Sequence, residues 1–402
     1  MTPARPGSLT AITALVLTGL YFAQGLPFGF FTQAVPVMLR RAGFGLVEIS
    51  AAGVLFAPWA LKFLWAPYVD RYGTRKRWLV ALQLVTAATA LVLATLDYSD
   101  TLTWLFVGIA VINVASATQD VATDGLAVRL LDERGRGLGN GIQVGAYRIG
   151  MIVGGGGLLL LYGVAGWRAL FVAMAVLLLL ATLPVCLLRE PPAGREHTTG
   201  ALALTGTWIT RLRRPGVPAF LGLLVAFKFG DSMTSALVGP YLVDSGCTIT
   251  EISWVKGGLA SAGALAGAAA GGVLTARMGR RRALLVTGIA QTASLGLYLV
   301  SALGVGGFAL VVAATLAEHV LGGAATVALF ALMMDACEAA HAGTDYTLYA
   351  CAVVLAQGAA GLAGGVIGDL AGYPALFGTG LVLSGLGCAV LVLGLRRGLG
   401  PT

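Results

Sequence analysis

The stretch AGWRALF at residues 165–171 returns as AGYPALF at residues 371–377, an offset of 206. The stretch DRYGTR at residues 70–75 returns as ARMGRR at residues 276–281 with the same offset. Two shorter matches have offsets of 203 and 204, namely Glu48-Ile49-Ser50 with Glu251-Ile252-Ser253 and Pro36 with Pro240. Four matches in one order at nearly one spacing indicate an internal duplication, so we predict two homologous halves.

The composition is that of a membrane protein. Residues of the class AVILMFWYC make up 57% of the 402 residues, a further 58 residues are glycine, and 11% are charged. Soluble domains contain about 25% charged residues, so this chain has too few charges to cover its apolar side chains in water. This excludes a soluble enzyme, a disordered chain and, despite a net charge of +8, a nucleic-acid-binding protein.

Apolar runs recur along the whole chain, and each is long enough to cross a bilayer, which takes about 20 residues. Read against clusters of glycine, proline and charge, they predict twelve helices that begin near residues 10, 46, 78, 102, 138, 168, 216, 250, 283, 306, 344 and 373. We therefore expect an all-α polytopic membrane protein with two pseudo-symmetric six-helix halves, at residues 1–188 and 216–402. The polar stretch 189–215 between them is predicted to be a cytoplasmic linker.

The cations of the predicted loops are unevenly divided. Nineteen Lys and Arg residues fall at the termini and in the even-numbered loops, against three in the odd-numbered loops, Arg40, Arg41 and Arg168. Because cationic loops stay on the cytoplasmic side, we expect both termini in the cytoplasm and the protein in the inner membrane. The other four cations fall inside predicted helices: Lys62, Arg148, Lys228 and Lys256.

Charged residues inside the predicted helices are candidates for a functional site. The set comprises Lys62, Asp120, Asp124, Arg148, Lys228, Asp231, Glu318 and Asp335. Each would cost about 3 kcal/mol if it faced lipid at the bilayer centre, so these side chains must face a cavity or one another. Helix rise places Lys62, Asp120 and Arg148 at one depth, roughly 12 to 15 Å from the cytoplasmic edge, which predicts one cluster. Asp124 lies one turn from Asp120, and Lys228 can pair with Asp231 three residues away.

These charges allow a structural and a functional interpretation. In the structural one, neutralised pairs such as Lys62 and Asp120 hold helices in register. In the functional one, Lys228, Asp231 and Glu318 lie at the depth of an alternating-access site. We interpret His319 as a hydrogen-bonded interior residue, with a proton relay as the alternative. Asp335, Glu338, His341 and Asp345 are interpreted as a solvated loop at the inner end of the tenth helix.

Two glycine-rich stretches occupy equivalent places in the two halves. They are Gly150 with Gly154 to Gly157, and Gly358, Gly361, Gly364, Gly365 and Gly368. Small residues at helical spacing let helix backbones approach closely, so we predict tight helix packing at both places. The sequence contains no HExxH, GxSxG or phosphate-binding motif and no Cys/His set with metal spacing, so we expect no enzyme, cofactor or metal.

Two six-helix halves with a repeated loop are typical of the major facilitator superfamily, in which the substrate site lies between the halves. The stretch at residues 70–75 resembles the signature loop of that superfamily and keeps Asp70, Arg71, Gly73 and Arg75. The second copy has Ala276 in place of the acid. The resemblance implies that only the first copy forms the full charge latch of a gating loop.

Longer motifs resemble the AmpG-like branch of this superfamily. They are GLYFAQGLPFG (19–29), PWALKFLWAPYVDR (58–71), QDVATDGLAV (119–128), AYRIG (146–150) and FKFGD (227–231), with Glu318 followed by Gly322-Gly323. That branch includes the bacterial muropeptide permeases, siderophore permeases, the acetyl-coenzyme A transporter and the orphan carriers called major facilitator superfamily domain-containing protein 3. The opening stretch and the short linker are most similar to those orphan carriers.

The resemblance implies a secondary transporter for a polar, anionic metabolite, such as a peptide, muropeptide fragment, siderophore or acyl-coenzyme A. It also implies coupling to protons, in a monomer embedded in the lipid bilayer. By motif match, Lys62, Asp120, Asp124, Arg148, Lys228, Asp231 and Glu318 are the buried charges of the family, and Gln24 of the opening stretch joins them as a candidate for substrate binding or coupling. The alternative function is a carrier-fold protein that senses or scaffolds without transport.

Overall fold

The computed structural model describes residues 10–71, 73–96, 102–130, 136–188, 210–337 and 342–399, and within these ranges every regular element is helical. The first half contains α1 (Ala11–Gly29), η1 (Phe30–Ala34), α2 (Val35–Arg41), α3 (Leu46–Ala51), η2 (Ala52–Phe56), α4 (Ala57–Leu61), η3 (Lys62–Leu64), α5 (Ala66–Arg71), α6 (Arg75–Thr95), α7 (Leu102–Leu130), α8 (Arg136–Ile152), η5 (Val153–Gly157) and α9 (Leu158–Leu187). The second half contains α11 (Val217–Asp244), α12 (Ile249–Ile252), η6 (Ser253–Leu259), α13 (Ala260–Met278), α14 (Arg280–Ala302), α15 (Gly307–Asp335) and α16 (Ala342–Arg396). Most of the predicted linker, residues 189–209, lies outside the described residues.

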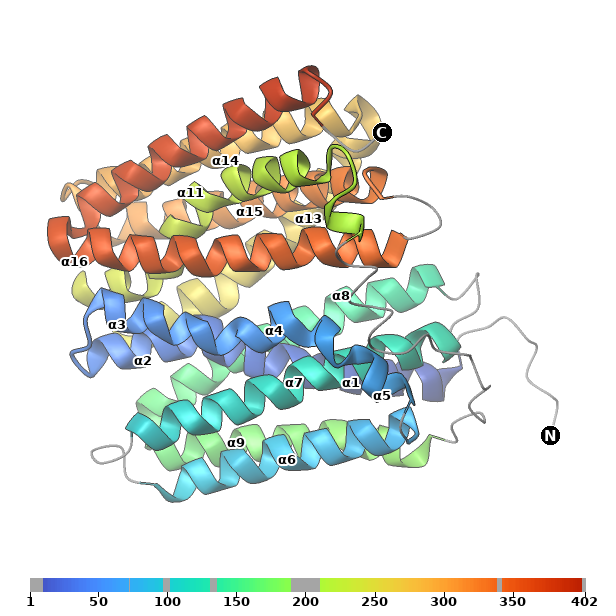
Figure 1. The fold of residues 1–402 in the computed structure, drawn as a ribbon. Coiled ribbons are helices and arrows are strands. Elements are labelled where there is room, and N and C mark those ends of the chain that lie inside the picture. Colours follow the sequence, from blue (N-terminus) through green and yellow to red (C-terminus); the bar gives the residue numbers. More distant parts are fainter. Residues whose placement is uncertain are drawn as a thin grey trace. The chain divides into compact units, whose positions relative to one another are not determined.

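Nine of the described helical segments are long and apolar enough to cross a membrane. Two of them, residues 142–187 and 345–396, each contain two spans, because the chain leaves the helical conformation at Gly166 and at Gly372. Figure 1 shows the second case, where α16 runs in one direction in orange and returns in red. The shorter apolar segment Leu46–Leu61 supplies the remaining span. The prediction of an all-α, twelve-helix membrane protein is thus confirmed.

The duplication inferred from sequence is repeated in the backbone. Gly166 and Gly372, which are equivalent in the two copies, both have φ of 80°. Gly73 and Gly279 form a second equivalent pair and have φ of 78° and 79°. A residue with a side chain rarely adopts this left-handed conformation, so the four glycines set the same sharp turns in both copies.

Several spans are interrupted by turns that are wider or tighter than an α-helix. The π-helical turn η1 follows Pro27, which cannot donate a backbone hydrogen bond to the preceding turn, and η5 coincides with the glycine run 154–157. The π-helical η6 and the 3₁₀-helical η2 occupy overlapping places in the two copies. η6 begins at the serine of the repeated Glu-Ile-Ser stretch, and η2 begins two residues after the serine of its own copy. Such local departures from α-helical geometry occur often at functional sites.

The chain divides into two compact units, which we describe separately. The first comprises residues 1–35 and 61–201, and the second comprises residues 36–60 and 202–402. In the first unit a core forms around Leu20, Leu79 and Leu126, and in the second around Phe220, Leu224 and Tyr349. The chain therefore enters the second unit within its first predicted span and returns to the first unit within its second span.

Glycines bring helix backbones into direct contact in both units. A side chain at Gly154 would collide with the carbonyl oxygen of Leu26, where α1 meets the helix formed by α8 and η5. In the second unit, a side chain at Gly365 would collide with the carbonyl group of Leu46. The predicted tight packing at the two glycine-rich stretches is confirmed.

Candidate functional site

In the first unit, Lys62 and Asp120 form an ion pair between η3 and α7. The Lys62 Nζ donates to Asp120 Oδ2, and the two side chains are 26% and 15% exposed. Three residues further on, Trp65 Nε1 donates to Thr118 Oγ1 at 3.0 Å and joins the same two segments. The predicted meeting of Lys62 and Asp120 is confirmed.

Asp124 lies one turn along α7 from Asp120 and has a different partner. Tyr21 of α1 donates its hydroxyl to Asp124 Oδ1 at 3.2 Å. Among the side chains that the structure describes, no cation lies within ion-pair distance of Asp124, which is exposed. The carboxylate therefore remains open to a proton or a cation from solution.

Arg148 does not join the Lys62–Asp120 pair. Its Nη1 lies 3.9 Å from the sulfur of Met151, a weak acceptor, and no described carboxylate is within ion-pair distance. The close approach of α1 and α8 at Gly25 and Gly150 sets the position of this segment. Of the predicted three-residue cluster, the contact between Lys62 and Asp120 is confirmed, and the membership of Arg148 stays a prediction.

Gln24, the other candidate of the first unit, is buried on α1 with 1% exposure. Its Nε2 has no hydrogen-bond partner among the described residues. A buried amide donor without a partner is costly, so a water molecule or a ligand must satisfy it.

In the second unit, Lys228 and Asp231 form a buried ion pair within α11. Lys228 Nζ lies 2.6 Å from Asp231 Oδ2, and both side chains are less than a tenth exposed. The other oxygen, Asp231 Oδ1, has no described hydrogen-bond partner. The predicted local pairing is confirmed, and it leaves one carboxylate oxygen available.

Glu318 of α15 is held by two neighbours. Ser235 donates its hydroxyl to Glu318 Oε1 at 2.6 Å, and the ring of His319 contacts Glu318 Oε2. His319 Nδ1 also lies 3.0 Å from the carbonyl oxygen of Thr315, so its interpretation as a hydrogen-bonded residue is confirmed. The carboxylate of Glu318 and the ring of His319 therefore lie side by side on α15.

The sequence did not settle the position of Lys256, and the structure buries it. Lys256 lies in η6 and is 8% exposed. Its charge interacts with that of Glu318, but among the described residues no acceptor lies within hydrogen-bond distance of its amine. Each unit thus contains one of the predicted ion pairs and one additional cation, Arg148 or Lys256, without a carboxylate partner in the described chain.

The signature loop is described in part. Asp70 and Arg71 are the last residues of α5, and their side chains lie outside the described residues. Gly73 adopts the left-handed conformation, and Thr74 caps α6 by accepting from the backbone N–H of Arg77 at 3.3 Å. The guanidinium of Arg75 packs against Gly125 of α7, where any side chain would collide with it. The loop is thus fitted to α7, close in sequence to Asp120 and Asp124.

One predicted surface residue is buried. Asp345 is 1% exposed and accepts from Arg211 Nε and Nη2 at 2.7 and 2.6 Å, with Arg214 Nη1 at 3.7 Å. Its interpretation as part of a solvated loop is wrong, because the predicted linker supplies two arginines that cover it. Asp335 is exposed as expected, and Glu338 and His341 lie outside the described residues.

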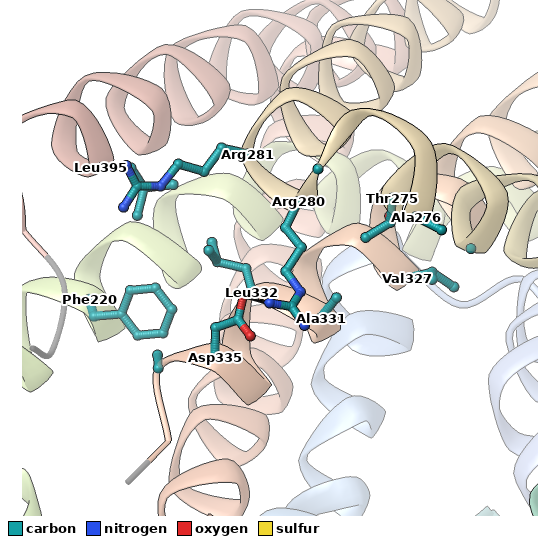
Figure 2. A pocket seen from close by; sticks show the side chains of 13 residues that line it. Phe220, Thr275, Ala276, Arg280, Arg281, Val327, Ala331, Leu332, Asp335 and Leu395 are labelled. Carbon is teal, nitrogen blue, oxygen red and sulfur yellow. Dashed lines mark hydrogen bonds and ion pairs between the residues drawn. The ribbon is translucent and has the colours of Figure 1, made fainter.

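The second unit also contains a cavity of about 800 Å³ among α13, α14, α15 and the ends of α11 and α16. In Figure 2, Arg280 points toward Asp335, with which it forms an exposed ion pair, whereas Arg281 extends toward Leu395. Of the charged residues first considered as site candidates, the exposed Asp335 lines this cavity, whereas Lys228, Asp231 and Glu318 do not. It is therefore separate from the buried charges described above.

The chain is similar to membrane transporters in both sequence and structure. The family model described as Major Facilitator Superfamily matches residues 17–229. The anhydromuropeptide permease of Escherichia coli (strain K12) is 30% identical over 344 residues, which cover 83% of this chain and 70% of the permease. A Rickettsia conorii protein assigned as transporter AmpG 4 is 24% identical over 376 residues, which cover 89% of this chain and 90% of that protein. The solved structure of a D-xylose-proton symporter matches with a TM-score of 0.74 at 12% identity, covering 97% of this chain and 98% of that chain.

Proposed function

This chain belongs to the Major Facilitator Superfamily, and on that premise we propose that it carries a polar, anionic metabolite of the muropeptide type across the inner membrane by alternating access. It is a multi-pass membrane transporter with a small-molecule substrate. The choice of a muropeptide rests on the similarity to the anhydromuropeptide permease, and an anionic substrate is supported by the buried cations of this chain.

The observation that carries this proposal is the isolation of Arg148. Lys62 pairs with Asp120, whereas the half-buried guanidinium of Arg148 has the sulfur of Met151 as its described hydrogen-bond partner. A cation that is partly withdrawn from water without a counter-charge is destabilising, and an anionic group that binds there offsets the cost. A guanidinium also holds a carboxylate or phosphate through two parallel hydrogen bonds. We therefore assign Arg148 to the substrate, with Lys62, Asp120, Asp124 and Gln24 as its polar surroundings.

We propose that protons drive the transport and that Asp231 or Glu318 is the coupling acid. Protonation of Asp231 would release Lys228 for an anion, and Glu318 can exchange a proton together with His319. Asp120 is a poorer candidate because it is already paired with Lys62. A carboxylate that is alternately hydrated and desolvated changes its proton affinity during the cycle, which is what coupling requires.

The arrangement in the membrane completes the proposal. From the uneven loop charges we infer that both termini lie in the cytoplasm and that the halves 1–188 and 216–402 are joined by a cytoplasmic linker at 189–215. Asp70, Arg71, Gly73 and Arg75 then form a gating loop on the cytoplasmic side. A monomer suffices for this mechanism.

The proposal is tested with purified protein in liposomes. The wild-type protein should accumulate a radiolabelled 1,6-anhydromuramyl tripeptide when a pH gradient is imposed. Arg148→Gln should raise KM about tenfold or more, since a hydrogen bond to a charged group contributes about 1.5 to 3 kcal/mol. Arg168→Gln, which removes an exposed arginine of the same unit, is the matched control and should leave KM unchanged.

Three other outcomes are informative. Binding of the tripeptide without transport under any gradient would support a sensor or scaffold instead. Transport by Arg148→Gln with the wild-type KM would remove the observation on which the anionic substrate rests. Transport that ignores the pH gradient would contradict proton coupling alone.

A further inference from the structure

Lys256 is a buried cation that the fold itself does not require. The internal repeat places Gly53 at the equivalent position of the first copy, three residues after the matching Glu-Ile-Ser stretch ends. Both copies interrupt the helix there, in η2 and in η6, so the interruption does not depend on a lysine. The amine of Lys256 is therefore not needed to form this interruption of the helix.

Lys256 makes no described hydrogen bond or ion pair with Glu318. Glu318 is near enough for its charge to act on the amine, but its Oε1 accepts from Ser235, and its Oε2, which lies beside the ring of His319, has no described hydrogen-bond partner. Within the described residues the three N–H donors of Lys256 therefore have no acceptor. A cation at such a position is costly, so it is retained where it contacts a ligand or a counter-charge.

A second polar group in the same turn also has no partner. Ser253, three residues before Lys256 in η6, is 5% exposed, and its Oγ makes no hydrogen bond to any described residue. Buried hydroxyl groups are nearly always hydrogen-bonded, so Ser253 also indicates a missing ligand or water. Lys256 supplies positive charge and Ser253 supplies a neutral donor, a combination that suits an anionic oxygen.

We propose that Lys256 is a second anion-binding residue of the transporter and that it holds a carboxylate or phosphate of the substrate, with Ser253 as an auxiliary donor. This inference rests on the proposed function and narrows it. Lys256 is buried and has no described carboxylate partner. A substrate that carries a free carboxylate, as a peptide stem does, suits this amine.

The test compares Lys256→Gln and Lys256→Arg in proteoliposomes, with two probes. One probe is the 1,6-anhydromuramyl tripeptide, and the other is the same compound with its peptide carboxyl groups amidated. The wild-type protein should prefer the carboxylate form by about tenfold or more, and Lys256→Gln should raise KM for that form and lose most of the preference. Lys256→Arg should retain the wild-type KM and the preference for the carboxylate form, because arginine keeps the positive charge. Ser253→Ala should raise KM about threefold, the loss expected for one neutral hydrogen bond.

A measurement on the wild-type protein covers the case in which Lys256→Gln does not fold. Acylation of lysines by a water-soluble ester, followed by mass spectrometry, should be slower at Lys256 when the tripeptide is bound, but unchanged at Lys76. Equal acylation of Lys256 with and without the tripeptide would overturn the inference, as would a wild-type KM and a wild-type preference in Lys256→Gln. If the wild-type protein transports neither probe, the proposed function fails. If it transports the tripeptide and only Arg148→Gln is impaired, only the assignment of Lys256 fails.

Discussion

Arg40 and Asp244 stand at equivalent positions of the two repeats, and they bind each other. Arg40 Nε lies 2.8 Å from both carboxylate oxygens of Asp244, and Arg40 Nη2 lies 2.5 Å from Oδ2. Tyr373 also donates its hydroxyl to Asp244 Oδ2 at 2.6 Å. Duplication thus produced two copies of a helix end whose side chains have since become opposite in charge. From the sequence, Arg40 served only to predict the orientation of the chain in the membrane. The offset of 204 residues between Pro36 and Pro240 also aligns Arg40 with Asp244.

The next helix start differs between the two copies in how it is capped. In the second copy, Thr248 Oγ1 accepts from the backbone N–H of Glu251 at 3.2 Å. In the first copy Gly45 has no side chain, and Asp369 of α16 accepts from the backbone N–H groups of Leu46 and Val47, both at 2.8 Å. The start of α3 is therefore capped by the C-terminal half of the chain. Any movement that separates α3 from α16 must break these two bonds.

The first prediction concerns this cap. Asp369→Ala should lower stability by about 1 kcal/mol, the usual contribution of a helix cap. Gly45→Ser should restore part of the loss in the Asp369→Ala background, since the serine would cap α3 as Thr248 caps α12. In the wild-type background the same serine would crowd Asp369 Oδ2, 3.1 Å from the new Cβ, and should not stabilise. Thermal unfolding in detergent measures the two single variants and the double variant. An equal effect of Gly45→Ser in both backgrounds would contradict the assignment of Asp369 as the cap of α3.

The second prediction concerns the pair Lys62 and Asp120. Lys62→Met and Asp120→Asn should each damage stability and uptake, because each leaves a charge without its partner. The double variant should cost less than the sum of the two, with a coupling energy above about 0.5 kcal/mol. A double-mutant cycle on unfolding and on uptake measures the coupling. If the effects of the two substitutions add exactly, the contact between Lys62 and Asp120 contributes to neither stability nor uptake.

The third prediction concerns proton coupling. Asp231→Asn and Glu318→Gln should abolish uphill uptake driven by a pH gradient, and one of them should leave substrate exchange intact, because exchange needs no net proton movement. Asp335→Asn is the matched control, since Asp335 is an exposed acid of the same unit. Counterflow and gradient-driven uptake in liposomes separate the two activities. Accumulation with the wild-type pH dependence in both variants would show that neither acid couples.

The fourth prediction compares a buried with an exposed ion pair. Asp345→Asn should lower the free energy of unfolding by about 3 kcal/mol, because it leaves Arg211 buried beside a neutral side chain. Asp335→Asn should cost less than about 1 kcal/mol, because Asp335 and Arg280 are 40% and 51% exposed and solvent screens them. Chemical unfolding of both variants in the same detergent gives the comparison. Equal costs would mean that Asp345 is hydrated in solution.

The fifth prediction concerns Cys337, which lies two residues beyond the end of α15. Burial, with a smaller contribution from the negative charge of Asp345, raises the pKa of the Cys337 thiol to about 11. The thiolate is the reactive form, so maleimide labelling near neutral pH should be slow and should rise about tenfold for each pH unit up to that pKa. Mass spectrometry of labelled Cys337 over a pH series measures this. Saturation of the rate below about pH 9, near the ordinary pKa of a thiol, would contradict the raised pKa.

Local physical chemistry made several features of this protein readable from its sequence. Hydropathy and the length of the apolar runs determined the twelve spans, since each crossing depends on its own residues. The repeat spacing predicted two halves and aligned the turns at Gly166 and Gly372. Helix rise predicted that Lys62 meets Asp120, and helix periodicity predicted that Lys228 meets Asp231.

Tertiary packing decided the rest, because contacts between distant segments depend on how helices rotate and approach, which hydropathy does not encode. Arg148 shares a predicted depth with Asp120 but makes its described contact with Met151, since depth does not specify the direction of a side chain. Asp345 follows a predicted loop but is buried, since two arginines from the distant linker segment fold over it. Asp369 caps a helix that begins in the opposite half of the sequence. Lys256 became a candidate only when the structure showed that it is buried and that no described hydrogen bond or ion pair joins it to Glu318 of another helix.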